Sequence, residues 1–474
     1  MSTPRICHAE YMPGTVAQDA HVPVLIVGGG ACGLTAALML HDAGVDCAVL
    51  ERDRTPLGSS ALSSGFIPAP GTQAQHAAGI DDSPERFAAD ISAKAKGRAA
   101  PHLVQAYAQA IGPALDALQE RHGLQWQVLD GFLYPGHSVR RMHATPEKTG
   151  VGLMGRLANA VTAADIPLIT EATVRELWVN ARQRVIGVGY ERPDGTLEHL
   201  ACDALILACN GFGGNPAMVR ELLPEMRDAL FAGHTGNDGS AIAWGQALGA
   251  RLADLGGYQG HGSWAIPQGA LISWALMMEG GIQANALGER FHDETQGYSE
   301  ASVHVLAQPG GVAWNVFDTP ILALARTFPD FVDAEAAGAV KHCDSVQALA
   351  AVIGCEESKL IATLANTTRT WGQKDSKLAE NRVFQRPLQA PYCAVKVTGA
   401  LFHTQGGLDI DAQCRVLDAG GQPFPNLLAA GGAARGVSGD AVWGYLSGNG
   451  LLSAVAGGFI AAHKAAELVT HPED

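Results

Sequence analysis

A glycine-rich turn near the start of the sequence, Gly28-x-Gly30-x-x-Gly33, constrains the fold most strongly. It follows a short apolar run, Val22 to Val27, which is typical of a buried parallel strand, and it opens a helical stretch from Ala31 to Ala43. Glycines at these spacings permit a tight turn and let a pyrophosphate approach the N-terminus of the helix. The turn therefore predicts a nucleotide-binding strand–turn–helix.

A second apolar run completes this unit. Asp46 to Leu50 reads as the next strand, and Glu51 follows it. A carboxylate at the end of that strand can accept hydrogen bonds from a ribose. The resulting βαβ unit predicts dinucleotide binding, and the motif alone does not separate FAD from NAD. No second dinucleotide motif is evident, so direct use of NAD is not expected.

Length and composition exclude several classes of protein. With 474 residues, 57 of them glycine, and 17% charged residues, the chain predicts two or three compact domains rather than a disordered or coiled-coil protein. The net charge of −15 disfavours binding to nucleic acid. The nine cysteines form no CxxC pair, which argues against a metal site or a disulfide framework. We expect no signal peptide, no transmembrane segment and a cytoplasmic location.

Local patterns predict further elements. Residues 1–21 suggest an irregular arm. Ser83-Pro84-Glu85 marks the start of a helix, because serine is a good N-cap and proline suits the first helical turn. Residues 103–121 predict an amphipathic helix, Asp203 to Ala208 a buried strand, and Ser447 to Ala462 a helix rich in small residues.

Six further motifs occur in a fixed order. They are Gly58 to Gly65 (GSSALSSG), Ala208 to Asn215 (ACNGFGGN), Thr235 to Gly239 (TGNDG), His403 to Leu408 (HTQGGL), Ala429 to Gly432 (AAGG) and Ser447 to Gly450 (SGNG). In this order and spacing the set resembles the flavoprotein superfamily of fumarate reductases and 3-ketosteroid dehydrogenases. The resemblance covers roughly residues 22 to 465.

The resemblance implies an α/β fold with two parts. A Rossmann-type FAD-binding domain would comprise residues 1–255 and 403–474, and an α+β capping domain of residues 256–402 would be inserted into it. The family binds its substrate between the cap and the flavin ring. An external electron acceptor is implied, whereas its identity and the oligomeric state are left open.

The resemblance also implies FAD as the cofactor. It adds to Gly28, Gly30, Gly33 and Glu51 the residues Ser59, Ser60, Gly65, Ala208, Asp238, Gly431, Asn449, Gly450 and Leu451. Some members attach FAD through a histidine in the segment matching residues 58–66. No histidine stands there, so we expect non-covalent binding. The family often has Ala-Gly-Glu where this chain has Ala430-Gly431-Gly432.

Departures from the fumarate reductase pattern carry the functional information. Two histidines that help to hold a dicarboxylate in that subfamily match His261 and His403. The proton-delivering arginine, however, matches Tyr298, and the substrate-clamping arginine matches Tyr445. The relay glutamate and arginine match Trp274 and Met277. Because only arginine offers a bidentate cationic fork, such a pocket suits a less charged substrate with an apolar body.

Tyrosine at both positions resembles the 3-ketosteroid dehydrogenases. That likeness implies that Tyr445, with a nearby backbone N–H, binds a substrate carbonyl and that Tyr298 removes the α-proton. It gives Tyr134 an assisting role. An O–H donor stabilises the developing enolate, and Tyr298 can accept the proton if its pKa, ordinarily about 10, is lowered.

The sequence leaves more than one role open for several residues. Trp274, Ser273 and Trp443 are assigned to the substrate pocket, where bulky aromatics would favour a one-ring substrate over a steroid; the tryptophans would otherwise be core. Arg435 is either a surface residue or a partner for a substrate carboxylate. Arg140, Arg141 and His143 are interpreted as a solvated face or an entrance.

The leading hypothesis is FAD-dependent α,β-desaturation of a cyclic ketone, such as a cyclohexanone or an oxo-cyclohexanecarboxylate. The alternatives are a fumarate-reductase-type ene-reductase acting on an unsaturated acid or ketone, and a 3-ketosteroid dehydrogenase. A third class is a catalytically silent flavoprotein that binds a ligand or partner, which would carry FAD without any change of flavin colour on adding ketone or enone.

Overall fold

The computed structural model describes residues 4–12, 21–131, 133–369 and 386–471. The chain forms two units. Unit 1 comprises Met1–Leu222, Gly233–Tyr258 and His403–Asp474, and unit 2 comprises Leu223–Ala232 and Gln259–Phe402. Residues 223–232, which sequence analysis grouped with the FAD domain, lie in unit 2 because β11 (Leu230–Phe231) pairs in parallel with β18 (Tyr392–Thr404).

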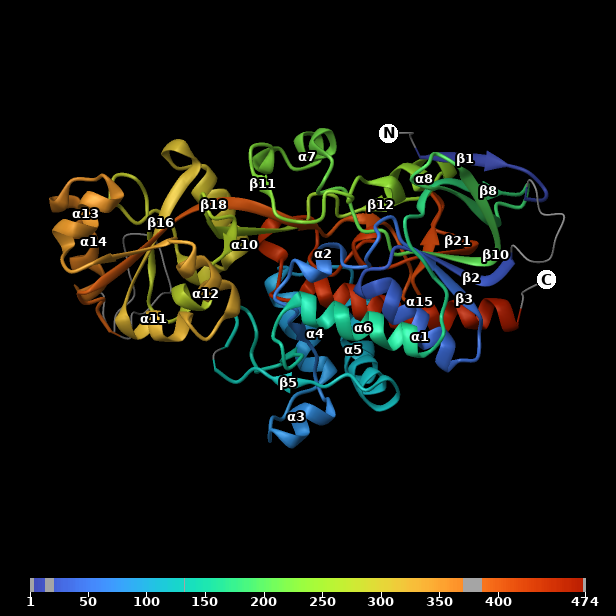
Figure 1. The fold of residues 1–474 in the computed structure, drawn as a ribbon, viewed down its shortest axis with the longest axis horizontal. Coiled ribbons are helices and arrows are strands. Elements are labelled where there is room, and N and C mark those ends of the chain that lie inside the picture. The colour runs from blue at the N-terminus through green and yellow to red at the C-terminus, as the bar shows by residue number, and fades with distance from the viewer. Residues whose placement is uncertain (1–3, 13–20, 132, 370–385, 472–474) are drawn as a thin grey trace. The chain divides into compact units, whose positions relative to one another are not determined.

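Unit 1 is built on a sheet whose centre is parallel (Figure 1). Strand β2 (His21–Val27) pairs in parallel with both β3 (Cys47–Leu50) and β10 (Leu197–Leu207), and β10 also pairs in parallel with β21 (Pro423–Ala429). The paired parts of these strands are apolar and buried, as expected for a parallel sheet with both faces covered: residues 24–27, 47–50, 204–207 and 427–429. The predicted α/β Rossmann-type architecture is confirmed.

Two helices cover the first βα turn. Helix α1 (Ala31–Asp42) packs on α15 (Asn449–Thr470) so closely that a Cβ on Gly458 would lie 2.4 Å from the Cys32 carbonyl oxygen. Among the described residues, α15 is the one helix long and apolar enough to cross a membrane. Because 61% of its apolar window is buried inside the protein, its environment is that of a core helix.

The N-terminal segment differs from its prediction. Arg5–His8 forms strand β1, which pairs in parallel with β8 (Thr173–Val179), and Arg5 forms an ion pair with Glu176. The expectation of an irregular arm is therefore wrong for this part, because the otherwise open edge of β8 supplies the hydrogen-bonding partners. Residues 1–3 and 13–20 lie outside the described residues.

The other predicted helices are present. Helix α4 (Pro84–Lys94) begins as expected, with the Ser83 hydroxyl accepting the Arg86 N–H at 3.2 Å, and α5 (Pro101–His122) covers the amphipathic stretch. The remaining elements of unit 1 are α2 (Gly58–Ala61), β4 (Ile67–Pro68), α3 (Gln73–Ala77), β5 (Gln127–Val128), β6 (Met142–Ala144), α6 (Gly150–Ala163), β7 (Leu168–Ile169), β9 (Val185–Glu191), α7 (Pro216–Leu222), α8 (Ser240–Leu248), β12 (Leu252–Ala253), β19 (Gly407–Leu408), β20 (Arg415–Leu417), η5 (Gly431–Ala433) and η6 (Val442–Gly444).

Unit 2 is an α+β unit around the long strand β18. This strand pairs antiparallel with β16 (Val312–Asp318) and β17 (Val340–Cys343). The other elements are η2 (Pro224–Met226), β13 (Tyr258–Ala265), β14 (Ala270–Leu271), α9 (Ala275–Met278), β15 (Ile282–Ala284), η3 (Glu294–Gln296), α10 (Tyr298–Leu306), η4 (Pro309–Gly311), α11 (Thr319–Ala325), α12 (Pro329–Ala336), α13 (Val346–Ile353) and α14 (Glu357–Arg369).

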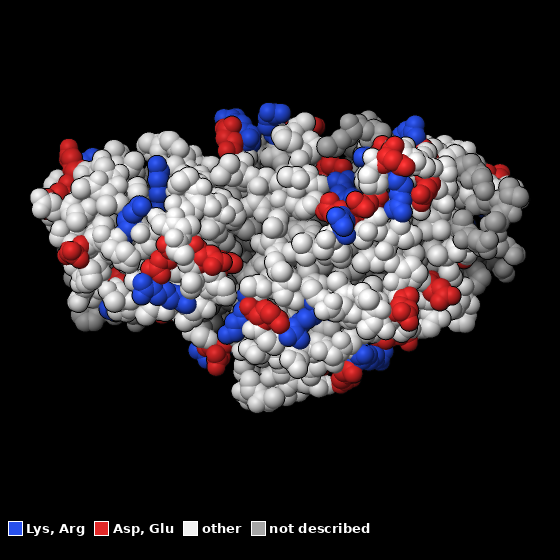
Figure 2. Space-filling model, in the orientation of Figure 1, with Lys and Arg blue, Asp and Glu red and all other residues white. Residues whose placement is uncertain are grey.

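The charged side chains are sparse, as the composition requires. On the face shown in Figure 2, lysine and arginine alternate with aspartate and glutamate in small mixed groups, and most of the surface is uncharged. On this face the acidic excess is therefore not gathered into one patch.

Candidate active site

The glycine turn after β2 is shaped by close backbone packing. Gly28 has φ +110°, and a Cβ there would lie 2.5 Å from the Ala208 carbonyl oxygen. A Cβ on Gly33 would lie 1.9 Å from the Gly28 carbonyl oxygen. A Cβ on Gly30 would meet only the Ser60 hydroxyl, at 3.7 Å. Gly28 and Gly33 are thus needed for the turn itself, whereas Gly30 leaves space in front of α1.

Glu51 lies across this turn. Its carboxylate accepts the Gly29 N–H at 2.6 Å and the Asp53 N–H at 2.9 Å. Burial raises the pKa of Glu51, and these two backbone hydrogen bonds oppose that rise. Gly30 is the N-cap residue of α1 and has no side chain to cap the helix; the Ser60 hydroxyl accepts the Ala31 N–H of the first turn at 3.2 Å. The open cradle, the helix N-terminus and the carboxylate fit the pyrophosphate and ribose of a dinucleotide.

The two types of glycine give a testable distinction. Gly33→Ala should distort the turn and yield protein with little FAD. Gly30→Ala should fold normally but bind FAD more weakly than the wild type, because the added methyl group occupies the space of the pyrophosphate. The FAD-to-protein ratio after purification and the melting temperature check both. Gly155→Ala, where a Cβ would meet nothing within 4 Å, is the control. A Gly33→Ala protein with full FAD content would contradict this account.

The segments around Ser59, Gly65 and Asp238 complete this region. The Ser59 hydroxyl accepts the His234 N–H at 2.9 Å and the Asn237 side-chain N–H at 2.8 Å. A Cβ on Gly65 would lie 2.6 Å from the Thr149 carbonyl oxygen. The Asp238 carboxylate pairs with Arg52 at 3.1 Å and accepts the Ser240 hydroxyl. In this structure, Ser59 and Asp238 therefore hold the loops beside the turn together.

The Ala-Gly-Gly segment has a packing explanation. Ala208 follows β10 and donates its N–H to the Val27 carbonyl at 2.8 Å, and Gly431 has φ +61° beside Cys32. A Cβ on Gly432 would lie 2.0 Å from the Asn210 side-chain oxygen. Asn210 thus occupies the space that a glutamate at position 432 would need.

Tyr445 directly follows η6, four residues before α15 begins. The Gly450 N–H donates to the Tyr445 hydroxyl oxygen at 3.3 Å, and the side chain of Tyr445 is buried. We call the Tyr445 hydroxyl and the Gly450 N–H the donor pair. His403 packs edge-on to the Tyr445 ring at 5.7 Å, and a Cβ on Gly450 would lie 2.4 Å from its Nε2. Burial lowers the pKa of His403 to about 4, so its imidazole is neutral at pH 7.

Asn449 and Leu451 flank Gly450 on α15. The Asn449 side-chain N–H donates to the Ser438 hydroxyl at 2.9 Å, and that hydroxyl donates to Gln405 at 2.7 Å. The Gln405 amide in turn contacts His403 Nδ1 at 3.2 Å. Leu451 lies in the apolar core. Asn449 is therefore joined to His403 by a chain of buried polar side chains.

Tyr298 opens α10 in unit 2. It follows Gly297, whose φ of +132° favours glycine, and its side chain is 9% exposed. The ring of His261 stacks on that of Tyr298 at 4.7 Å with an interplanar angle of 17°. His261 Nδ1 accepts the Ser263 N–H at 3.1 Å, so its proton is on Nε2. Burial lowers the pKa of His261 to about 3, which leaves it neutral.

The remaining predicted pocket residues have mixed environments. In unit 2, Trp274 is 2% exposed and packs edge-on to His261 at 5.9 Å. Its indole N–H donates to the Glu294 carbonyl. The neighbouring Ser273 hydroxyl accepts the Ala275 N–H at 3.3 Å. In unit 1, the Lys96 ammonium lies 4.3 Å above the Trp443 ring, and Tyr134 contacts Phe66 edge-on at 6.5 Å. The structure thus brings Trp274 together with His261 and Tyr298.

Arg435 has neither of the two predicted environments. Its guanidinium pairs with Asp254 at 2.7 Å and with Asp409 at 3.3 Å, all within unit 1. Because these two carboxylates already neutralise it, Arg435 is an internal structural cation rather than a clamp for a substrate.

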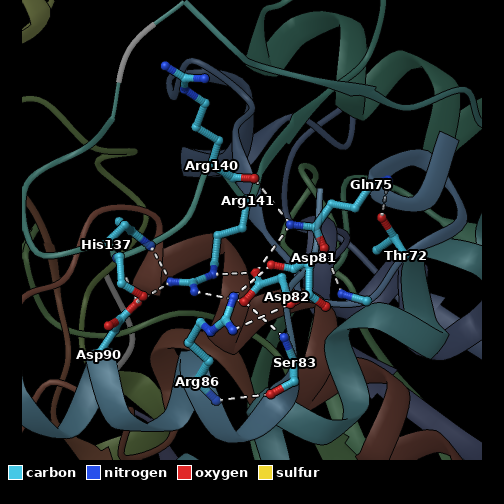
Figure 3. Close-up of polar contacts among 12 residues, drawn as sticks. Thr72, Gln75, Asp81, Asp82, Ser83, Arg86, Asp90, His137, Arg140 and Arg141 are labelled. Carbon is cyan, nitrogen blue, oxygen red and sulfur yellow. Dashed lines mark hydrogen bonds and ion pairs between the residues drawn. The ribbon is translucent and has the colours of Figure 1, made fainter. Parts of the chain in front are cut away.

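The prediction of a solvated face is wrong for Arg141 and His143. Both are buried, and Arg141 forms ion pairs with Asp82 and Asp90 (Figure 3). The Arg140 side chain is exposed, as predicted. Two carboxylates offset the cost of burying one guanidinium. Because Asp82 lies 59 residues before Arg141, no local sequence pattern predicts this ion pair.

The cysteines and acidic residues show no further centre. All nine cysteines are free thiols, and the described residues contain no group of three or more His, Cys, Asp or Glu side chains that could hold a metal ion.

Comparison with known proteins agrees with this geometry. The FAD binding domain family model matches residues 23–451. An NADH:fumarate oxidoreductase of Klebsiella pneumoniae is 27% identical over 96% of this chain, which spans 48% of that protein. The 4-oxocyclohexanecarboxylate 2-dehydrogenase of Sinomonas cyclohexanicum is 25% identical, with 90% of this chain and 89% of that protein covered.

Two solved structures share the fold. A flavocytochrome c3 fumarate reductase superposes with a TM-score of 0.80 at 26% identity, covering 95% of this chain and 79% of that one. The 3-ketosteroid-Δ4-(5α)-dehydrogenase of Rhodococcus jostii RHA1 gives 0.75 at 23% identity, covering 96% and 99%. With the glycine cradle and Glu51 in place, the chain belongs to the FAD binding domain family and is an FAD-dependent oxidoreductase.

Proposed function

We propose that this enzyme desaturates a cyclic ketone between its α and β carbons. The observation that carries the proposal is the donor pair of Tyr445 and Gly450 beside a neutral histidine. Uncharged O–H and N–H donors suit a ketone oxygen, whereas a dicarboxylate needs cationic partners. The second tyrosine, Tyr298, also stacks on a neutral histidine.

In the proposed mechanism the donor pair binds the ketone oxygen. The Tyr445 hydroxyl donates to that oxygen, and the Gly450 N–H, which donates to the Tyr445 hydroxyl oxygen, makes this hydroxyl a stronger donor as negative charge develops on the ketone oxygen. Fixed donors of this kind stabilise an enolate-like transition state without having to reorient during the reaction. His403 packs beside Tyr445 and, being neutral, adds no competing charge.

Tyr298 is the proposed base. It takes the proton from the α-carbon, while the β-carbon loses a hydride, so that a C=C bond forms next to the carbonyl. The glycine turn, Ser60 and Glu51 would hold FAD, which would supply the hydride acceptor when bound. His261 stacks on Tyr298 and holds its ring in place. Tyr134 is proposed to assist the two other tyrosines, as the family resemblance implies. The products are an α,β-unsaturated ketone, the abstracted proton and reduced FAD.

The proposed substrate is a one-ring ketone such as cyclohexanone or an oxo-cyclohexanecarboxylate. The neutral histidines and the bulky Trp274 beside His261 support it. The name of the Sinomonas relative describes a reaction of this class, which adds support at 25% identity. A 3-ketosteroid is the alternative substrate class. We further propose non-covalent FAD, a separate electron acceptor, a cytoplasmic location and a capping role for residues 256–402.

An anaerobic titration tests the proposed function. Purified holoenzyme is mixed with cyclohexanone, 4-oxocyclohexanecarboxylate or a 3-ketosteroid, and the oxidised flavin band is followed. We expect bleaching by a one-ring ketone, with formation of the matching enone. Bleaching by the steroid alone would overturn the substrate class. No bleaching by any ketone would overturn the desaturase assignment.

An ene-reductase is the second candidate. The 27% identity to a protein named NADH:fumarate oxidoreductase favours it, and so do the retained His261 and His403. It runs the same chemistry in reverse on an unsaturated acid or ketone. In the same experiment it predicts that pre-reduced enzyme is reoxidised by an enone or by fumarate while ketones leave the oxidised flavin unchanged.

A further inference from the structure

A buried ionic cluster reaches the loop that carries Tyr445. The cluster consists of Arg141, Asp82, Asp90 and His137, all in unit 1 (Figure 3). The Arg141 side chain is fully buried, and its Nε and second terminal nitrogen bind the two oxygens of Asp82 at 2.8 and 3.0 Å. Its remaining terminal nitrogen binds Asp90 and contacts His137 Nδ1 at 3.1 Å.

These contacts fix the tautomer of His137. A guanidinium nitrogen can only donate, so His137 Nδ1 is the acceptor and its proton is on Nε2. Burial, together with the charge of Arg141, lowers the pKa of His137 to about 4, so the ring stays neutral. The Phe87 ring stacks on the imidazole at 6.0 Å, and the Arg141 guanidinium lies over the same ring at 4.8 Å, so one aromatic ring packs against both groups.

The protonated nitrogen of His137 binds the main chain beside the donor pair. His137 Nε2 donates to the Ser447 carbonyl at 2.9 Å, between Tyr445 and Gly450 in the sequence. On the other side of this loop Asn449 is held by Ser438. The loop is thus fixed by a side-chain hydrogen bond at each of these two residues, and one of these bonds is oriented by a buried cation.

We propose that His137, oriented by Arg141, is a positioning residue for the carbonyl-binding donor pair. The inference rests on the proposed function, since it assigns the loop a ligand oxygen. His137 does not touch the substrate in this account. It fixes the Ser447 carbonyl, and hence the distance and direction between the Tyr445 hydroxyl and the Gly450 N–H. Without this bond the loop remains folded but samples several arrangements of the two donors.

A matched pair of variants separates this role from packing. In His137→Gln the amide nitrogen reaches the position of imidazole Nε2 and can still donate to Ser447. In His137→Asn the amide reaches only the Nδ1 position, which keeps the contact with Arg141 and loses the bond to Ser447. His122→Asn, which changes the pair of His122 with Asp42, is the control for a histidine elsewhere in unit 1.

The readouts are ketone turnover and binding of 4-hydroxybenzoate, whose phenol oxygen mimics an enolate, followed through the flavin absorption of the holoenzyme. We expect His137→Asn to lower kcat and weaken phenol binding by about three- to tenfold, with FAD content unchanged, and His137→Gln to restore both to within about twofold. Equal behaviour of the two variants would overturn the positioning role. Wild-type enzyme that neither binds the phenol nor reacts with ketones would overturn the proposed function and this inference with it.

Discussion

Tyr298→Phe should lower ketone turnover by about 10²–10⁴-fold, the usual contribution of a positioned general base. Phenylalanine keeps the ring that stacks on His261 and removes only the hydroxyl oxygen that accepts the proton. FAD content and melting temperature should therefore stay close to those of the wild type. Rapid-reaction measurement of flavin bleaching by the ketone, together with the FAD-to-protein ratio, checks both parts.

The control for Tyr298 is a second tyrosine of unit 2 with similar burial. Tyr392 on β18 is 7% exposed, against 9% for Tyr298. The flavin of the Tyr392→Phe enzyme should be bleached at nearly the wild-type rate, because Tyr392 has no part in the proposed chemistry. A Tyr298→Phe enzyme that retains more than about a tenth of the wild-type bleaching rate would contradict the assignment of Tyr298 as the base.

Tyr445→Phe should slow the same step by about 10²–10³-fold, the effect expected for removing one donor to a developing oxyanion. The loss should appear mainly in kcat, because the hydroxyl binds the enolate-like transition state more strongly than the ketone. The backbone N–H of Gly450 remains, so some catalysis persists. Binding of 4-hydroxybenzoate should weaken in parallel with kcat.

Tyr190→Phe is the matched control in unit 1. Tyr190 is buried to a similar degree, and its hydroxyl donates to Glu198 at 2.6 Å. Its replacement removes one hydrogen bond from the sheet and none from the donor pair, so activity should be unchanged. If Tyr445→Phe altered KM alone and left kcat intact, Tyr445 would bind ground state and transition state equally, contrary to the proposed role.

The parts of the fold that sequence predicted are those with local signals. The strand, the glycine turn and α1 are contiguous, and Gly28 and Gly33 mark close backbone approaches within the unit. Helix α4 was predicted from its own N-cap, Ser83. Helix α15 was predicted from Ser447 to Ala462 and runs from Asn449 to Thr470, because its apolar alanine-rich pattern continues against the core.

The parts that sequence missed depend on distant partners. Strand β1 exists because β8 offers it an edge, and Leu230–Phe231 joins unit 2 through β18. Arg141 is buried because Asp82 and Asp90 face it, which no spacing within its own segment indicates. Tyr298, Tyr445, His261 and His403 all came from the family resemblance. The packing of each histidine against a tyrosine and the neutral state of both imidazoles became apparent only from the structure.

An isotope effect on flavin bleaching tests the desaturase assignment. Oxidised holoenzyme is mixed anaerobically in a stopped-flow instrument with 4-oxocyclohexanecarboxylate, either undeuterated or deuterated at both carbons next to the carbonyl. We expect both ketones to bleach the flavin. The rate should be lower with the deuterated ketone, because the α C–H bond breaks as Tyr298 takes the proton. Flavin that stays oxidised with every cyclic ketone, while the reduced enzyme is reoxidised by an unsaturated acid, would contradict the desaturase assignment.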